Sequence, residues 1–401
     1  MNIRTSAAIL MLGLAASSHA ITPEEAAERI LEYGGSRELI LQNNYAKDME
    51  TLGMANAPDP RIEGEYLIAP AGEDNRWGVG IGYEFDWPGA YSARGNLGSA
   101  IRGQNASQAH ADLYRKKADI LNTIWTWLYA DRKLDLMRKV SATNDSIRVI
   151  AAKAERGGEL SRLDISKIDI EHSRINSVIA GIENEKLSAE GQLNILFGGT
   201  YCNELLESIA CDWSATPLAG LDDYKACAQN NPLLVNAICG VNVADKNIAV
   251  AKSERLPGFS VGYSHEYEDG MHFNGANLGI SIPIFSSRNK VKAAQAAKAV
   301  AEMERHNASL QMESDVIALY NEVVALDKSI ATPMAVFSST DYAEMLLKAY
   351  RGGEMSLAEY LTELSWFYEA HLEFMDLQYQ RESKAAQLSL ISSSVLPILS
   401  E

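Results

Sequence analysis

Four segments of the chain alternate apolar and polar residues with a period of two. They cover residues 61–70, 76–87, 259–268 and 273–284, and the polar turns "AGEDN" and "EDGMH" join them in pairs. About ten residues is the length that a tilted strand needs to cross a membrane in a β-barrel. Aromatic residues, typical of the two membrane interfaces, recur on or beside them: Tyr66, Tyr83, Phe85, Trp87, Tyr263, Tyr267 and Phe273. The pattern predicts two β-barrel hairpins; a small soluble antiparallel sheet is the alternative.

A long helical pattern follows each hairpin. From Ala90 to Arg156 there is no proline, and apolar residues form a stripe with helical spacing: Leu113, Ile120, Ile124, Trp127, Leu134, Leu136, Val140, Ile147, Ile150 and Ala154. In the second half, apolar residues recur every seven positions, as in a left-handed coiled coil: Ala296, Met303, Leu310, Ile317 and Val324. Pro333 is expected to interrupt and kink this second helix. A helix of about 65 residues is roughly 100 Å long, so we expect the helices to pack along one another as a rod or tube.

The hexapeptides "RGGELS" (156–161) and "RGGEMS" (351–356) have the composition of tight turns between helices. Their paired glycines can adopt the positive φ that ends a helix. The serine that closes each hexapeptide can cap the next helix, and an acidic residue three positions later completes a capping box. The pairs are Ser161 with Asp164 and Ser356 with Glu359. Returning helices are expected over 162–197 and 357–395.

These features repeat with a spacing of about 195 residues. Besides the hexapeptides, "YSARGNLGSA" (91–100) corresponds to "FSSRNKVKAA" (285–294), and each is preceded by a glycine-rich strand pattern that ends in an aromatic and proline corner. Self-similarity over so long a stretch indicates a tandem duplication. The remaining pieces, 21–60 and 200–255, look like shorter helices, and we expect them to pack together as a collar.

The N-terminal segment "MNIRTSAAILMLGLAASSHA" has a charged start, an apolar run and a small-residue cleavage site after Ala20. It is interpreted as a secretory signal peptide, the alternative being a short helix. No later stretch has 18 uninterrupted apolar residues, so no transmembrane helix is expected. The net charge is −17, or −18 without the signal and its Arg4, which argues against nucleic-acid binding.

The cysteine content and the motifs argue against an enzyme and a cofactor. Cysteines occur at four positions without CxxC spacing, which makes a zinc site improbable: Cys202, Cys211, Cys227 and Cys239. After export they can form one or two disulfides or remain unpaired thiols. The chain has no GxSxG, HExxH or phosphate-binding GxxxxGK[ST] motif. No catalytic residue and no cofactor is therefore expected.

An exported and duplicated chain, with strand, strand, long helix, turn and helix in each half, resembles the outer-membrane efflux (TolC) family. The residues that carry the resemblance are the corners "FDWPGAYSAR" and "IPIFSSR", the two hexapeptides, and "NNPLLVNAICGVNVADKNIAVAKSERLPGFSVGY" before the third strand. It covers residues 22–397. The corner "FDWPG" is similar to members that serve heavy-metal cation pumps.

The resemblance implies a mixed membrane β-barrel and α-helical barrel in the outer membrane of a Gram-negative bacterium. Each protomer of a homotrimer would give four strands to a 12-stranded barrel above a long coiled-coil periplasmic tunnel. Implied partners are outer-membrane lipid, a periplasmic adaptor (membrane fusion) protein and an inner-membrane pump, of the resistance-nodulation-division type or an ABC transporter. The implied regions are a signal peptide (1–20), an equatorial collar (21–60 with 200–255), barrel strands (61–87 with 256–285) and tunnel hairpins (88–199 with 286–397).

The resemblance also implies roles for residues at the two turns. Asp164, Glu359 and Tyr350 match positions that close the periplasmic entrance, and we hypothesise a latch between Asp164 and Tyr350; simple helix capping by the two carboxylates is the alternative. Ser356 departs from a position that is often basic in the family. The turns are also candidate adaptor contacts, with plain turn chemistry as the alternative: Gly157, Gly158, Glu159, Leu160, Ser161, Gly352, Gly353, Glu354, Met355 and Ser356.

The segment "HEYEDGMH" (265–272) groups imidazoles and carboxylates that can bind a divalent metal. His265, Glu268 and His272 are the candidate ligands, and Glu266 and Asp269 lie beside them; a solvated loop is the favoured alternative. Together, the patterns and the resemblance predict a passive exit duct of a tripartite efflux system for small molecules or metal cations. The alternatives are a type I protein-secretion channel and a soluble periplasmic coiled-coil scaffold.

Overall fold

The computed structural model describes residues 20–70, 75–158, 160–199, 202–211, 213, 217–339 and 342–392. The predicted signal peptide lies, except for Ala20, outside these residues. The chain forms two compact units, one of 1–39, 113–228 and 314–401 and the other of 40–112 and 229–313. We describe each unit by itself; the first is called the helical unit and the second the sheet unit.

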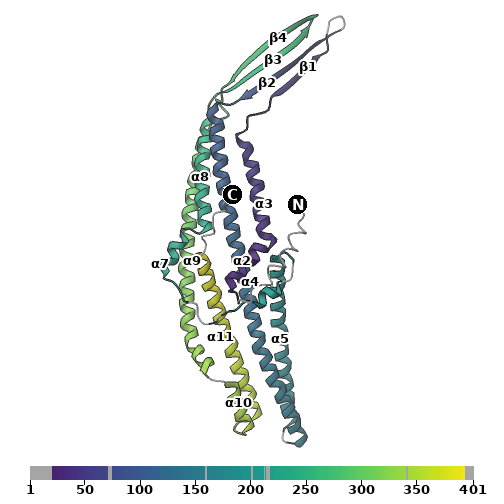
Figure 1. The fold of residues 1–401 in the computed structure, drawn as a ribbon, viewed down its shortest axis with the longest axis vertical. Helices are drawn as coiled ribbons and strands as arrows, with labels where there is room; N and C mark the ends of the chain where they lie inside the picture. Colours follow the sequence, from purple (N-terminus) through teal and green to yellow (C-terminus); the bar gives the residue numbers. More distant parts are fainter. Residues whose placement is uncertain are drawn as a thin grey trace. The chain divides into compact units, whose positions relative to one another are not determined.

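The sheet unit contains an antiparallel sheet in the order β1-β2-β3-β4 (Figure 1). Its strands are β1 (Arg61–Leu67), β2 (Arg76–Phe85), β3 (Gly258–Glu268) and β4 (Met271–Ser281). All four predicted strands are confirmed, with ends that differ by up to three residues. The two hairpins join through β2 and β3, where Trp77 pairs with Tyr267 and Phe85 with Phe259. A tight turn links β3 to β4, and its Asp269 and Gly270 have positive φ angles of 49° and 77°.

Polar contacts connect helices of the sheet unit. These helices are α3 (Gly35–Leu52, mostly in this unit), η2 (Gly53–Ala55), α8 (Pro232–Ser253) and the first parts of α4 (Pro88–Gly157) and α9 (Lys290–Ser339). Asn105 donates to Asp48 at 3.0 Å, and Asn236 donates to Gln108 at 2.6 Å. Between α8 and α9 the buried apolar cluster is small: Ala251, Val291 and Ala294, with Ile248 against it.

One segment, Leu221–Ser253, is long and apolar enough by composition to cross a membrane, although no such helix was expected. Only 11% of its most apolar window is buried. It consists of two helices, α7 (Leu221–Ala228) and α8, because Asn231 caps α8 and Pro232 occupies its first turn. The longest continuous helix in it therefore has the 22 residues of α8.

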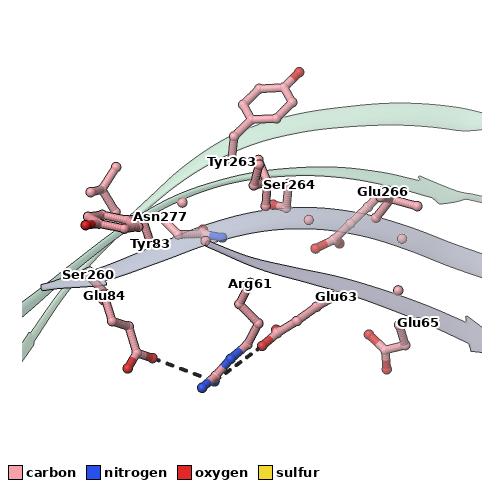
Figure 2. A pocket seen from close by; sticks show the side chains of 18 of the residues that line it. Arg61, Glu63, Glu65, Tyr83, Glu84, Ser260, Tyr263, Ser264, Glu266 and Asn277 are labelled. Atoms are coloured by element: carbon pink, nitrogen blue, oxygen red, sulfur yellow. Dashed lines mark ion pairs between the residues drawn. The ribbon is translucent and has the colours of Figure 1, made fainter. Parts of the chain in front are cut away.

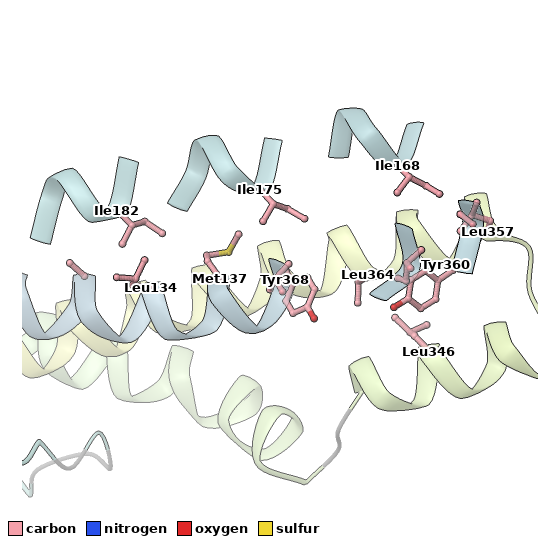
Figure 3. Packing of buried hydrophobic residues seen from close by; sticks show 14 residues of the cluster. Leu134, Met137, Ile168, Ile175, Ile182, Leu346, Leu357, Tyr360, Leu364 and Tyr368 are labelled. Carbon is pink, nitrogen blue, oxygen red and sulfur yellow. The ribbon is translucent and has the colours of Figure 1, made fainter. Parts of the chain in front are cut away.

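The helical unit is built on two helical hairpins with a shared apolar core. The later part of α4 pairs with α5 (Arg162–Leu196), and α10 (Tyr342–Arg351) pairs with α11 (Leu357–Ser392). Figure 3 shows side chains from all four helices in this core. Smaller helices complete the unit: α2 (Pro23–Tyr33), α6 (Asn203–Glu207) and α7. A parallel bridge joins Ile21 to Ile209, so the two predicted collar pieces meet there; the collar as a whole remains a prediction.

The predicted stripe of the first long helix is confirmed at seven of its ten residues, whereas Leu136, Ile150 and Ala154 are half-buried. Leu113, Ile120, Leu134, Val140 and Ile147 of α4 are buried. Helical spacing places them on one stripe that faces the interior of the same chain.

The predicted seam of the second long helix is not buried within this chain. Met303 and Leu310 of α9 are exposed, with 67% of Met303 accessible. The buried residues of α9 beyond position 310 are Val316, Val323 and Ile330 instead, one position before the predicted stripe. The sequence period is the same whether a seam packs inside one chain or against another, so the period alone does not distinguish the two.

Two further expectations are settled by the structure. Pro333 does not interrupt its helix, because α9 continues past it to Ser339; proline removes a single backbone donor, which a helix of 50 residues tolerates. Of the two alternatives for the cysteines, disulfides or unpaired thiols, the structure has unpaired thiols: Cys202, Cys211, Cys227 and Cys239 are all free.

Candidate functional site

The two faces of the sheet differ in chemistry over most of their length. Because side chains alternate along a strand and paired residues share a face, the pairing assigns every strand residue to one side. We call one side the polar face: Arg61, Glu63, Glu65, Arg76, Glu84, Ser260, Ser264, Glu266, Glu268, Asn277 and Ser281. We call the other the apolar face: Ile62, Tyr66, Trp77, Val79, Ile81, Tyr83, Phe85, Phe259, Val261, Tyr263, Tyr267, Ala276, Leu278 and Ile280.

The polar face is lined by glycines and lies along a hollow of about 640 Å³. Gly78, Gly80, Gly82, Gly262 and Gly279 alternate with the apolar residues and leave the backbone of this face uncovered. Figure 2 shows Arg61, Glu63 and Glu84 on one side of the ribbon and Tyr263 on the other. The polar character is incomplete near the β3–β4 turn, where three apolar residues share the face: Leu67, Met271 and Phe273.

Every arginine and glutamate of the four strands lies on the polar face. Arg76 contacts Glu266 at 3.0 Å and Glu268 at 3.5 Å. Arg61 approaches Glu63 and Glu84 at 3.7 and 3.8 Å. Such exposed pairs contribute little to stability. Five carboxylates, including Glu65, stand against two guanidinium groups, so this face has an excess of three negative charges.

The apolar face is exposed despite its composition. Leu278 is 87% accessible and Ile62 75% accessible, and Val79, Ile81 and Val261 are also exposed. Contiguous apolar surface of this kind is rare on soluble proteins and marks an interaction with lipid or another protein. This face therefore requires an apolar environment outside the chain.

Aromatic residues of the apolar face gather at both ends of β2. At its end, Phe85 stacks with Phe259 and Tyr83, at centroid distances of 5.6 and 6.0 Å. At its start, Trp77 stacks with Tyr267 at 6.0 Å. Two aromatic groups that bracket an aliphatic band are the arrangement found at the two interfaces of membrane β-barrels.

The two helix turns have the predicted capping structure. Ser161 Oγ accepts from the backbone N–H of Asp164 at 3.2 Å, and the Asp164 carboxylate accepts from the N–H of Ser161 at 3.3 Å. Ser356 and Glu359 make the corresponding pair of bonds, at 3.3 and 2.8 Å. The second glycine of each hexapeptide has the positive φ, 78° at Gly158 and 76° at Gly353.

The residues of the two hexapeptides form the turns between α4 and α5 and between α10 and α11, as predicted. Gly157 ends α4 and Gly352 follows α10, while Leu160 and Met355 pack against the core of the helical unit. Glu354 is exposed. Glu159 lies outside the described residues.

Asp164 and Tyr350 do not contact each other in this structure. The hydrogen bond from Ser161 is the main cause that lowers the pKa of Asp164, and Lys167 lies 3.5 Å away. The backbone N–H of Ser356 lowers the pKa of Glu359. Burial raises the pKa of Tyr350, whose ring lies 5.2 Å from that of Tyr360. The structure gives both carboxylates a capping role, and gating by these residues remains a prediction.

Arg174 links the two helical hairpins, and the sequence patterns did not predict this role. From α5 it donates to Ser365 Oγ at 2.7 Å and to Glu369 at 3.3 Å, both on α11, and it also pairs with Glu171. Arg174 and Glu369 are 195 positions apart, which is the repeat length, so they occupy equivalent places in the two copies. The repeat length in the sequence could therefore have indicated that these two positions are equivalent.

The candidate metal ligands are not assembled into one group. Among the described residues, no three of histidine, cysteine, aspartate and glutamate come together at a potential metal site. Glu268 lies on the polar face and pairs with Arg76, whereas His265 and His272 lie on the opposite face. The segment is also not a solvated loop, because its residues belong to β3, a two-residue turn and β4.

Comparisons with known proteins agree with this fold. Residues 224–393 match the family model described as outer membrane efflux protein, whereas the curated proteins give no match. Among solved structures, a membrane protein of Pseudomonas aeruginosa is similar with a TM-score of 0.76 and 15% identity, over 96% of this chain and 94% of that one.

Two named channels show the same likeness. The CmeC outer membrane channel of Campylobacter jejuni has a TM-score of 0.73 and 14% identity, over 94% of this chain and 87% of that one. The open-state MtrE outer membrane channel of Neisseria gonorrhoeae has a TM-score of 0.70 and 15% identity, over 94% and 92%. The family match thus covers residues 224–393, about two fifths of the chain, and the likeness to these channels shows a shared fold over most of its length.

Proposed function

We propose that this protein is the outer-membrane exit duct of a tripartite efflux system, a passive channel that performs no chemical reaction. The observation that carries the proposal is the two-faced sheet, with an exposed apolar face and a charged, glycine-lined face on the same strands. A membrane barrel requires this division, because one face contacts lipid and the other contacts water.

The sheet also supports a trimer with a shared 12-stranded barrel. β1 and β4 are edge strands, each with one side left unpaired by the sheet. Backbone groups cannot remain unpaired in lipid, so a spanning sheet must close on itself. Four strands are too few to close, and three copies in register would supply twelve. The exposed stripe of α9, with Met303 and Leu310, supplies apolar surface for contacts between neighbouring protomers.

The charge of the polar face favours cations among the molecules that the duct would pass. Three copies would triple the excess of negative charge around one lumen, and a confined lumen of one sign concentrates counter-ions. We therefore favour cationic small molecules or metal cations as cargo. In this arrangement the energy for export comes from the inner-membrane pump, and the duct supplies only the path.

The two helix turns are the proposed contacts for the periplasmic adaptor. They are compact, capped and exposed, and Glu354 offers a carboxylate there. Reversal of charge at Glu354 and Glu159 is expected to lower drug or metal resistance in cells while leaving the purified channel conductive. Unchanged resistance with both reversals would contradict the adaptor contact.

Opening of the duct is proposed to involve Asp164, Tyr350 and Glu359, together with the link from Arg174 to Ser365 and Glu369. This link ties α5 to α11 within one chain, so its loss removes a polar contact between the two hairpins. Arg174→Gln is expected to raise open-channel occupancy more than Asp164→Ala or Tyr350→Phe. Equal conductance in all three variants and the unaltered protein would exclude these residues from gating.

Planar bilayer recording tests the proposed function. The purified protein in detergent is expected to insert, to conduct, and to pass potassium in preference to chloride. The soluble-scaffold alternative predicts a protein that remains monomeric without detergent and produces no conductance. A channel that conducts only when a secreted protein substrate is present would favour the protein-secretion alternative.

A further inference from the structure

The histidine pair at the far end of the β3–β4 hairpin lies, together with Asn274, on the otherwise apolar face. His265 Nε2 and His272 Nδ1 lie 3.2 Å apart, and the ring centroids are separated by 5.3 Å. His272 is exposed and His265 half-buried, so the pair is accessible from outside the chain. Trp77 and Tyr267 flank the two rings, at centroid distances of 5.6 Å to His265 and 5.1 Å to His272.

The hydrogen bonds determine which nitrogen of His265 has a free lone pair. Asn274 Oδ1 accepts from Tyr263 Oη at 2.7 Å and lies 2.8 Å from His265 Nδ1. An amide oxygen only accepts hydrogen bonds, so His265 Nδ1 carries the hydrogen. In the neutral ring, Nε2 is then the lone-pair nitrogen, and it is directed at His272 Nδ1.

We propose that His265 and His272 bind a late first-row divalent transition-metal ion, with Cu²⁺ bound most tightly. Two imidazole nitrogens that each lie about 2.0–2.1 Å from a shared ion are 3.2 Å apart when the angle at the metal is about 103°. That angle is between the square-planar and tetrahedral values. The observed separation therefore admits an ion in place of the shared hydrogen with little movement of either strand.

Asn274 acts as the outer-shell partner rather than as a ligand. Histidines that bind metals usually donate their other ring N–H to an oxygen, which fixes the ring orientation and the tautomer. The bond from His265 Nδ1 to Asn274 already provides this. His272 contributes Nδ1 after its hydrogen moves to Nε2, with no net loss of a proton, and water completes the coordination. Glu268 takes no part, because it is on the polar face.

The ligand class follows from the donor atoms. Imidazole nitrogen suits copper, nickel and zinc, and affinity for such a site is highest for Cu²⁺. Magnesium and calcium prefer oxygen ligands and are not expected to compete. The site belongs to one hairpin of one chain, so the inference does not depend on the proposed duct.

Titration of the purified, metal-free full chain in detergent with Cu²⁺ tests the site, with Trp77 fluorescence and electron paramagnetic resonance as readouts. We expect one Cu²⁺ per chain that quenches Trp77 and shows two coordinating nitrogens. His265→Ala and His272→Ala should each weaken this binding at least about tenfold. His306→Ala is the matched control, because His306 is exposed on α9, and it should leave binding unchanged.

Further variants separate loss of the metal from loss of the fold and test the role of Asn274. His265→Gln keeps a polar side chain of similar length and should lose the metal while circular dichroism stays unchanged. Asn274→Asp should tighten Cu²⁺ binding, and Asn274→Ala should weaken it by roughly 10–100-fold. Identical isotherms for the unaltered protein and the His265→Gln/His272→Gln double variant would overturn the site. Unchanged affinity in both Asn274 variants would overturn the role of Asn274.

Discussion

The two faces of the sheet are made by neighbouring residues of the same strands, and yet they suit opposite environments. Asn277 faces the charged, glycine-lined side, and Leu278, the next residue, belongs to the exposed apolar side. In a soluble sheet the apolar side would be covered by the protein's own core. Here the apolar side is left uncovered and the polar side is left open, which indicates that lipid covers one side and that water fills the other.

The largest expected effect comes from placing the same charge on each face. Leu278→Arg puts a guanidinium on the apolar face and should destabilise the inserted protein by about 2–4 kcal/mol, the cost measured near a bilayer midplane. Asn277→Arg adds the same group to the polar face and should insert normally. Folding into vesicles, followed by urea titration, measures both. Equal destabilisation by the two variants would show that the faces are not distinguished by lipid.

Removal of the carboxylates from the polar face should change ion selectivity without changing insertion. Replacement of all five glutamates by glutamine, at positions 63, 65, 84, 266 and 268, leaves the guanidinium groups of Arg61 and Arg76. The excess charge then changes sign, so the reversal potential in a potassium chloride gradient should also change sign. A reversal potential that is unaffected would mean that this face does not line the conducting path.

Added bulk on the polar face should reduce conductance while selectivity persists. Gly82 has open space where a side chain would begin, so Gly82→Leu is expected to fold and to narrow the lumen once per protomer. Single-channel conductance should fall, and the sign of the reversal potential should stay the same. Conductance equal to that of the unaltered protein would place Gly82 outside the lumen.

Loss of one guanidinium should have the smallest effect. Arg76→Gln removes a positive charge beside Glu266 and Glu268 and should make the channel slightly more cation-selective. Its pairs are exposed, so the free energy of unfolding should hardly change. Arg61→Gln is the matched variant and should behave in the same way. Lower cation selectivity in either variant would contradict the charge balance assigned to this face.

Local sequence chemistry predicted local structure well. The period of two located the four strands. Strand pairing then places every arginine and glutamate of these strands on one face. Both capping boxes formed as expected, because a cap depends on residues three positions apart. Most of the long stripe predicted for α4 is buried.

Features that depend on contacts between distant residues were not accessible in the same way. The heptad stripe of α9 predicts an apolar seam without saying which helix covers it, and Met303 and Leu310 are exposed in the single chain. The latch between Asp164 and Tyr350 rested on resemblance, and the observed link between the helical hairpins runs through Arg174 instead. Strand periodicity grouped His265, Glu268 and His272 by proximity in sequence, whereas pairing places Glu268 on the opposite face.

The most direct test of the central claim is spin labelling of two adjacent positions. Cysteine is introduced at Asn277 or at Leu278 in a background where the four free native cysteines are replaced by serine, and the protein is reconstituted in lipid. The account predicts that the label at 278 collides with oxygen dissolved in lipid, whereas the label at 277 collides with a water-soluble nickel chelate. Equal access of the nickel chelate to both labels would contradict it.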